Sequence, residues 1–227
     1  MNETQTPLFR RDFTLVVIGQ IISLFGNAIL RFALPLYLLR QTGSPALFGA
    51  VGAAAFVPAV LCAPIGGVVA DRVNKRTIMV ILDFSTAGLI LAFAVLLGRA
   101  PLTPLMVACL MLLYGIAGAY QPAVQASIPL LAAERLTSAN AVINMVGTLS
   151  GLLGPVIGGV LFGAFGIRPI LWVSIGCFFL SAVMELFIRI PHQPRGTEGS
   201  VLSTVGRDLW ESWHFIRREK PVFLSVM

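Results

Sequence analysis

Four charged residues stand close together between two long apolar segments: Asp71, Arg72, Lys75 and Arg76. The apolar segment before them, 46–69, contains no charged residue. Because charges are costly inside a membrane, this group can be solvated only where the chain leaves the bilayer. Asp71 ends its helix, where its charge opposes the partial negative charge of the helix terminus, so it should seek cations or the amino end of another helix. The group predicts a turn at the membrane surface that is held by ion pairs.

Three other ionisable residues, Arg31, Asp83 and Glu185, lie inside apolar segments. Such groups are expensive to bury and are functional candidates by default. Asp83 lies about two helical turns beyond the charged turn, and we expect it to join Asp71 in a gating role rather than to carry protons. Arg31 can reach the outer membrane surface or line an outer cavity, and both interpretations stay open. Glu185 is one turn from Arg189, with which we expect it to pair.

Uncharged polar residues near the middle of the apolar segments are candidates for a substrate cavity. They are Gln20, Asn27, Tyr114, Gln121 and Asn144, with Arg31 as a charged neighbour and Phe25 and Met145 as apolar walls. A cavity of this composition suits bulky amphipathic solutes better than sugars or phosphates. For each residue taken alone, a hydrogen bond between helices remains the alternative role.

The composition excludes most soluble classes of protein. Hydrophobic residues make up 57% of the chain and charged residues 11%, whereas a soluble domain has about 25% charged residues. The net charge of +6 does not predict a nucleic-acid partner, because the basic residues form no stripe with interleaved aromatics. No Walker sequence, nucleophile elbow or metal-ligand cluster occurs, and the three cysteines stand singly in apolar segments. We therefore expect neither an enzyme nor a cofactor or metal site.

Six segments are apolar and long enough to cross a bilayer, which takes about 20 residues. They are Phe13–Leu39, Ala46–Val69, Thr77–Leu97, Leu105–Ile128, Ala141–Phe165 and Ile170–Ile190. Lipid offers no partner to unpaired backbone groups, so these segments are expected to be helices. With the amino terminus in the cytoplasm, twelve of the 16 basic residues lie inside, three lie in outer turns and Arg31 lies in the first span. This distribution predicts a multi-pass membrane protein with a cytoplasmic amino terminus.

The sequence divides into four parts. Residues 1–12 are expected to be a cytoplasmic terminus, and 13–190 a six-helix transmembrane domain. Residues 191–220 read as a cytoplasmic linker with an amphipathic helix, which lies on the membrane or packs on another cytoplasmic segment. Residues 221–227 resemble the start of a seventh span, as if the chain were cut off there.

An internal repeat relates the second span to the fifth. Pro64–Ala70 reads PIGGVVA and Pro155–Gly163 reads PVIGGVLFG. The two spans run in opposite directions and occupy the same place in successive groups of three. Three-helix units of inverted topology are the architecture of many secondary transporters, whose solute site lies near the membrane midplane. The repeat therefore predicts an all-α membrane protein built from two inverted three-helix repeats.

These motifs resemble those of the major facilitator superfamily. The stretch from Gly67 to Arg76, with its Asp71-Arg72-Val-Asn74-Lys75-Arg76, is similar to the motif G-x-x-x-D-R-x-G-R/K-R/K between the second and third helices of that family. Asn74 replaces the usual Gly, and since Asn tolerates a left-handed backbone, the turn is expected to persist. The second resemblance, in the fifth span, is to a motif associated with antiporters; its residues are Gly154, Pro155, Gly158 and Gly159.

Other segments narrow the resemblance to the macrolide-efflux and siderophore-exporter branch of the drug:proton antiporters. They are Ser23–Asn27, Ala33–Pro35 and Leu136–Asn140; Asn27 stands where that branch often has Asp, which puts a proton-carrying role there in doubt. The resemblance implies the amino-terminal half of the major facilitator fold, with a carboxy-terminal six-helix half as partner and Asp71 as part of a latch between the halves. It implies proton-coupled efflux of amphipathic drugs or a siderophore-like molecule by alternating access. It also implies a location in the plasma membrane, here a bacterial inner membrane. The alternatives are a facilitator or lipid transporter of the same fold, or a truncated module that transports nothing.

Overall fold

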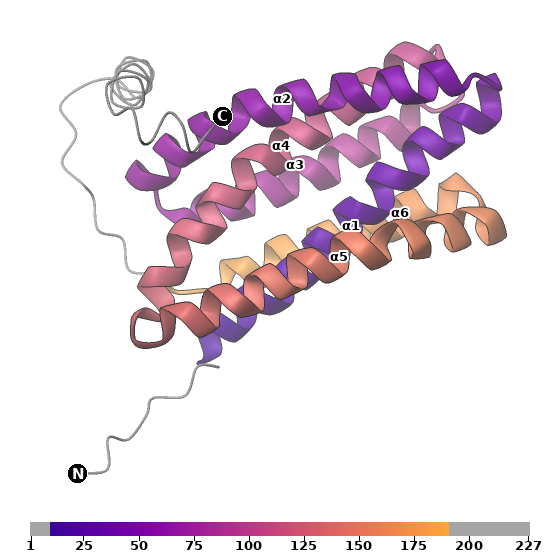
Figure 1. Cartoon of the computed structure of the whole chain (residues 1–227). Helices are drawn as coiled ribbons and strands as arrows, with labels where there is room; N and C mark the ends of the chain where they lie inside the picture. The colour runs from indigo at the N-terminus through magenta and orange to yellow at the C-terminus, as the bar shows by residue number, and fades with distance from the viewer. Residues whose placement is uncertain (1–9, 191–227) are drawn as a thin grey trace, which may run out of the picture.

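The computed structural model describes residues 10–190, and these form a bundle of six long helices (Figure 1). The helices are α1 (Arg11–Thr42), α2 (Pro45–Arg72), α3 (Lys75–Leu96), α4 (Leu102–Leu131), α5 (Leu136–Phe165) and α6 (Ile167–Leu186), and a short 3-10 helix, η1 (Ala133–Arg135), precedes α5. All six long helices are long and apolar enough to cross a membrane. The predicted all-α fold is confirmed. The predicted linker, its amphipathic helix and the seventh span lie outside the described residues.

The helices extend past most of the predicted spans, because the residues that flank the apolar segments, polar or apolar, continue the helix. Three of the short turns contain a glycine with positive φ, Gly43, Gly98 or Gly166, a conformation that glycine adopts without steric cost. The sixth helix is an exception. It ends at Leu186 instead of Ile190, since the chain tightens there: the Phe187 and Ile188 amides donate to the carbonyls of Met184 and Glu185, three residues back.

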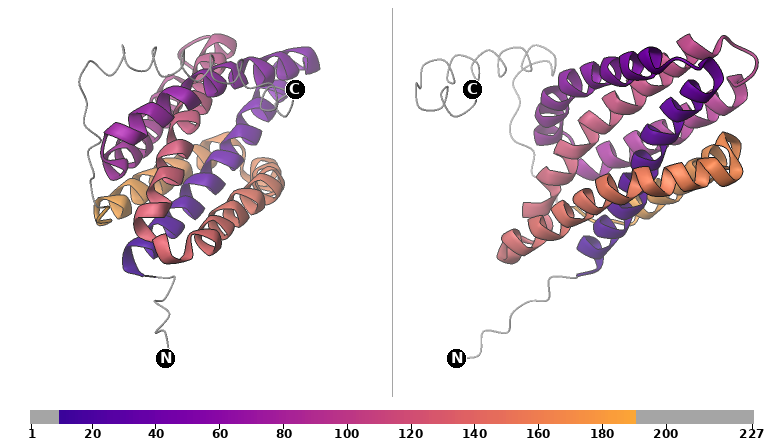
Figure 2. Two further views of the ribbon diagram at one scale, coloured as in Figure 1. Left: turned by 60° about the vertical axis from the view of Figure 1, so that its left-hand side comes forward. Right: turned by 45° about the vertical axis from the view of Figure 1, so that its right-hand side comes forward.

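The packing of the six helices is that of two related halves, α1–α3 and α4–α6. α1 packs mainly on α5 and α6, and α4 packs mainly on α2 and α3. The contact of α1 with α5 thus corresponds to the contact of α4 with α2, and that of α1 with α6 to that of α4 with α3. An internal two-fold repeat requires this correspondence. Figures 1 and 2 both show α1 running diagonally from the side of α5 and α6 toward α2. The packing thus has the symmetry that the sequence repeat predicts.

The repeated glycines bring backbones together in both halves. A Cβ built on Gly66 of α2 would lie 2.6 Å from the Cα of Ala119 in α4. A Cβ on Gly158 of α5 would lie 3.1 Å from the carbonyl oxygen of Ile29 in α1. Both glycines thus lie against the first helix of the opposite half. Small residues permit such close contact where lipid supplies no hydrophobic drive for helices to associate.

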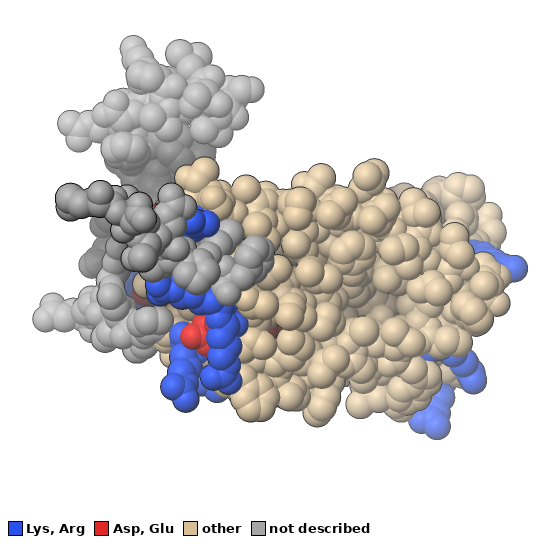
Figure 3. Space-filling model, turned by 90° about the horizontal axis from the view of Figure 1, so that it is seen from below, with Lys and Arg blue, Asp and Glu red and all other residues tan. Residues whose placement is uncertain are grey.

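The outer surface is that of a membrane protein. Large apolar side chains are exposed along the helices, among them Leu152 (67%), Val160 (67%) and Val173 (64%). In the face shown by Figure 3, the basic side chains gather at the two ends of the bundle and leave the middle uncharged. A soluble protein rarely exposes such a continuous apolar belt.

We expect Gly66→Ala to destabilise the protein, because the added methyl group meets backbone atoms of α4 that cannot rotate away. Overpacking of this kind costs about 1–3 kcal/mol. The measurement is the melting temperature of the purified protein. Gly67→Ala is the matched control, since a Cβ there meets nothing within 4 Å. Equal melting temperatures for the two variants would contradict the close contact.

Candidate functional site

A cavity of about 700 Å³ lies between α1, α2, α4 and α5. Its walls are mainly apolar, with a few polar side chains that come chiefly from α1 and α4. The lining residues are Ser23, Leu24, Asn27, Ala28, Arg31, Phe32, Ala59, Val60, Ala63, Tyr114, Ala117, Gly118, Tyr120, Gln121, Pro122, Gln125, Gly147, Ser150, Gly151 and Pro155. Since these four helices are the two pairs in closest contact, the cavity is the space left between the pairs.

Four of the predicted cavity residues line this space: Asn27, Arg31, Tyr114 and Gln121. Two do not. Gln20 is fully buried inside the bundle and donates to the Tyr120 hydroxyl at 2.8 Å, and Asn144 is an exposed residue of α5.

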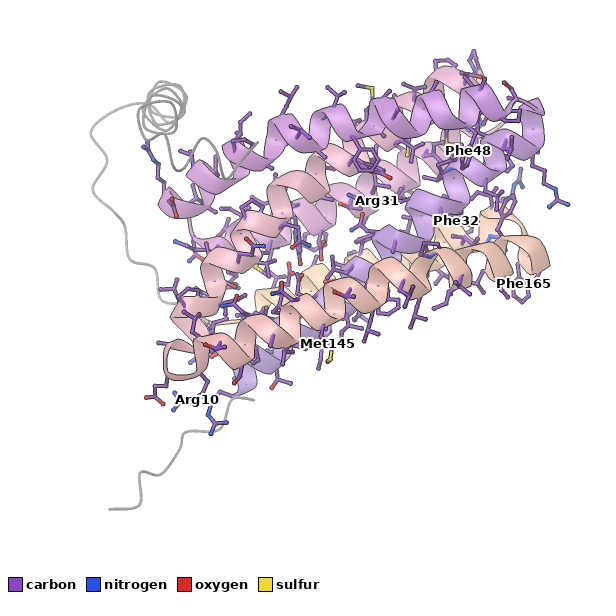
Figure 4. The ribbon with its side chains drawn as sticks, in the orientation of Figure 1. Arg10, Arg31, Phe32, Phe48, Met145 and Phe165 are labelled. Carbon is purple, nitrogen blue, oxygen red and sulfur yellow. The ribbon has the colours of Figure 1, made fainter. Side chains whose placement is uncertain are left out.

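The two predicted apolar walls also lie elsewhere. Phe25 lines a separate apolar groove between α1, α5 and α6, of about 490 Å³. Met145 is 57% exposed and points away from the bundle in Figure 4. Apolarity alone could not distinguish these positions, because lipid and cavity select similar side chains.

Ser23, which is not among the predicted cavity residues, lies on the cavity wall together with Asn27 and Arg31. The three are spaced at four-residue intervals, so they stack on one face of α1. This spacing is the signal that could have identified Ser23. Gln125, Tyr120 and Ser150 were also not selected; Gln125 follows Gln121 at the same spacing on α4.

Arg31 extends from α1 toward α2 and α4 (Figure 4). Its guanidinium carbon lies 3.9 Å from the centroid of the Tyr114 ring. This is a cation–π contact, worth about 0.5–2 kcal/mol according to how far water is excluded. Arg31 was expected either to reach the outer membrane surface or to line a cavity. In the structure it lines the cavity.

Asp83 is 2% exposed and accepts a hydrogen bond of 2.6 Å from Ser23. The Ser23 hydroxyl also lies 3.0 Å from that of Ser181 on α6, which in turn lies against the same carboxylate. The structure therefore groups Asp83 with α1 and α6, away from the charged turn at Asp71 where it was expected. The helix carries Asp83 two turns into the bundle, and the neighbouring hydroxyls solvate it there.

Glu185 is fully buried, and its Oε1 accepts a 2.6 Å hydrogen bond from the Tyr120 hydroxyl. Glu185 thus bonds to Tyr120 and not to Arg189, with which we expected it to pair. The backbone amide of Arg189 donates to Asp12. Oε2 of Glu185 has no hydrogen-bond partner among the described residues. Asp83 is close enough to interact with Glu185 electrostatically.

These residues form one buried polar network, which we define as Gln20, Ser23, Asp83, Tyr120, Ser181 and Glu185. It draws on α1, α3, α4 and α6. The network lies where the two apolar core clusters meet, one of which includes Leu30 and Phe178 and the other Phe13 and Val124. Because Ser23 and Tyr120 also line the cavity, the network borders the cavity at these two residues. No group of three His, Cys, Asp or Glu side chains in residues 10–190 could hold a metal.

The charged turn is short and joins α2 directly to α3. Asn74 caps α3, with Oδ1 accepting from the Arg76 amide at 3.0 Å. Its φ of −59° means that the turn does not use the left-handed backbone we expected of Asn74. Lys75 is buried and Asp71 is exposed.

The Arg76 guanidinium donates to the Leu186 carbonyl at the end of α6. A cation is favoured at this negative end of a helix. Arg76 thus links the turn to the end of α6.

The antiporter-type motif packs on α1. Gly154 lies against Ala28, Gly158 against Ile29 and Gly159 against the Phe32 ring, while Pro155 lines the cavity. The motif therefore sets how closely α5 approaches the helix that carries Asn27 and Arg31.

Comparisons with known proteins agree on the family. Residues 16–227 match the Major Facilitator Superfamily. The chain is 25% identical over 222 residues to macrolide efflux protein A of Streptococcus pyogenes, covering 96% of this chain and 54% of that protein. It is 26% identical to the multidrug efflux pump Tap of Mycolicibacterium fortuitum, covering 80% of this chain and 46% of the pump.

The fold agrees with a solved transporter structure. The in meso crystal structure of the POT family transporter PepTSo aligns with a TM-score of 0.67 and 17% identity, over 85% of this chain and 40% of that chain. At that identity the likeness concerns the fold alone. The chain belongs to the Major Facilitator Superfamily, and it spans about half the length of the curated relatives it matches.

We expect Tyr120→Phe to lower the stability of the protein, because it removes the hydroxyl that bonds to both Gln20 and Glu185. A buried polar group left without its partner costs about 1–3 kcal/mol. The melting temperature of the purified protein is the measurement. Tyr37→Phe is the control, since the Tyr37 ring packs on Phe162 and the described residues offer its hydroxyl no hydrogen bond. A loss as large in Tyr37→Phe would show that the network is not the cause.

Proposed function

We propose that this chain forms the amino-terminal half of a secondary transporter that exports amphipathic compounds, drugs or siderophore-like molecules, in exchange for protons. The cavity is the observation that carries the proposal. Small-molecule sites are concave, largely apolar and about 300–1,000 Å³, with a few polar groups that fix orientation. The cavity here has about 700 Å³ and the same composition. Its location between the two repeats is where transporters of this architecture bind solute.

The relatives support the direction of transport. Both efflux proteins named above match this chain over most of its length. A carboxy-terminal six-helix half would complete the cavity, and rocking of the two halves about the solute would give alternating access. In this proposal the amino terminus and the charged turn lie in the cytoplasm, where Asp71 is exposed and free to pair with a helix of the other half. Gly67, Arg72, Lys75 and Arg76 would position that latch.

The buried network supports coupling to protons. Asp83 and Glu185 are both buried, and the only hydrogen bonds that described residues give their carboxylates come from hydroxyl groups. An ionised carboxylate buried without a cation is strongly disfavoured, and two such charges close together repel each other. The pair is therefore expected to hold at least one proton in this conformation. Because Ser23 and Tyr120 border the cavity, solvent entering it in another state could take up that proton.

We expect export to depend on the proton gradient. The complete transporter, reconstituted inside-out in vesicles with an acidic lumen, should accumulate a fluorescent amphipathic dye in the lumen against its concentration gradient. The lumen should become more alkaline as protons leave in exchange. Collapsing the gradient with a protonophore should abolish the net movement. Export that continues unchanged after the collapse would defeat the proposal.

Asp83→Asn and Glu185→Gln should uncouple transport from protons. Both variants remove a titratable group but keep a polar side chain of the same size, so gradient-driven accumulation should fall at least tenfold while solute exchange at equal pH continues. Glu134→Gln is the control, because Glu134 is an exposed carboxylate of η1. Full gradient-driven accumulation by both carboxylate variants would exclude the network as the proton site.

A further inference from the structure

The cavity contains one positive charge and no negative charge from the described residues. Arg31 lines it, and the lining includes no Asp or Glu. Within residues 10–190 no carboxylate forms a salt bridge with Arg31, and the contact recorded for its guanidinium is the Tyr114 ring. The two carboxylates of the buried network lie elsewhere, bonded to Ser23 and Tyr120. Among the described residues, the lining itself therefore carries a single charge, the positive charge of Arg31.

The guanidinium has an unused hydrogen-bonding edge. Its Nε is buried and has no hydrogen-bond partner within the described bundle. Stacking on Tyr114 occupies a face of the planar group and leaves its N–H groups, which point outward in the plane, available. Nε together with a terminal nitrogen forms the fork that binds a carboxylate through two parallel hydrogen bonds. Tyr114 thus holds the group in a fixed plane without neutralising it.

Asn27 adds a second free atom one helical turn away. Its side-chain nitrogen donates to the Ser23 carbonyl at 3.0 Å, while its Oδ1 is buried without a partner in the part of the chain that the structure describes. Asn27 and Arg31 are four residues apart on α1 and both line the cavity, so they lie on one face of the helix. The pair offers an acceptor beside a cationic donor, against otherwise apolar walls such as Phe32 and Val60.

We propose that Arg31 and Asn27 form an anion subsite and that the solute is an amphipathic organic acid, with a carboxylate on Arg31 and a hydroxyl or amide N–H on Asn27. This assignment rests on the proposed function, whose solute class it narrows. A cationic amphiphile would place its charge beside an uncompensated guanidinium in a medium of low dielectric constant, where like charges repel strongly. An acid instead satisfies a buried cation, which is otherwise costly to keep in the membrane.

The test is binding to the complete transporter, purified in detergent, with no gradient and no transport. The probes are dansyl-labelled undecanoic acid and its methyl ester, which differ in charge but keep the same chain and fluorophore. We expect the wild type to bind the acid roughly ten- to hundredfold more tightly than the ester, the range of a charge-assisted hydrogen-bonded pair. Equal affinities, or preference for the ester, would overturn the assignment without bearing on whether the protein is a transporter.

Arg31→Gln should abolish the preference by weakening binding of the acid while leaving the ester unchanged, and Arg31→Lys should retain part of it. Arg40→Gln is the matched control: Arg40 is exposed in the last turn of α1 and lies over the Phe162 ring, so the net charge changes equally but the cavity does not. Melting temperatures show which variants fold. An acid preference that persists in folded Arg31→Gln would overturn the proposal. Tighter binding of short-chain phosphatidylglycerol than of the acid would also overturn it, because the ligand would then be a lipid headgroup.

Discussion

The interior of a bilayer offers polar groups no water to bond to, so a transmembrane bundle must satisfy them from within. Most of this bundle meets the requirement with backbone bonds inside six helices. A few buried polar side chains of α1, α3, α4 and α6 need partners as well, and they find them in one another. There Ser23 donates to Asp83 and Tyr120 donates to Glu185. These bonds link four helices at the level where the two apolar clusters meet, so the relative positions of the helices depend on them.

The cavity also depends on close backbone contact between helices. Gly66 brings α2 onto α4, and Gly158 brings α5 onto α1. With each first helix held tightly by the second helix of the other repeat, the two pairs stand apart, and the space between them is the cavity. Its polar residues follow from the same arrangement, since Asn27 and Arg31 lie on α1 and Tyr114 and Gln121 lie on α4. The repeat in the sequence and the cavity thus have one structural origin.

Several features could be predicted from the sequence because they depend on local composition. Apolar length predicts the helices, and glycine and proline predict turns, of which Gly43 and Gly166 are examples. The charged group at 71–76 predicts the α2–α3 turn for the same reason. Side-chain partners were harder to predict. Glu185 was assigned to Arg189 because the two are one turn apart, yet its hydroxyl partner Tyr120 is 65 residues away. Asp83 was likewise assigned to its neighbours in sequence, whereas Ser23 lies 60 residues away.

The sequence by itself determined the class of protein, the helices and their turns, and the presence of a repeat, because each depends on residues close together in the chain. Only the tertiary structure decided which polar residues face the cavity, which face lipid and which bond inside the bundle. Asn27, Gln20 and Asn144 are all amides in apolar segments, and one lines the cavity, one is buried and one is exposed. The difference comes from the rotation of each helix about its axis and from the helix that packs against it. Both are set by contacts between residues distant in the chain, such as Gly158 with Ile29.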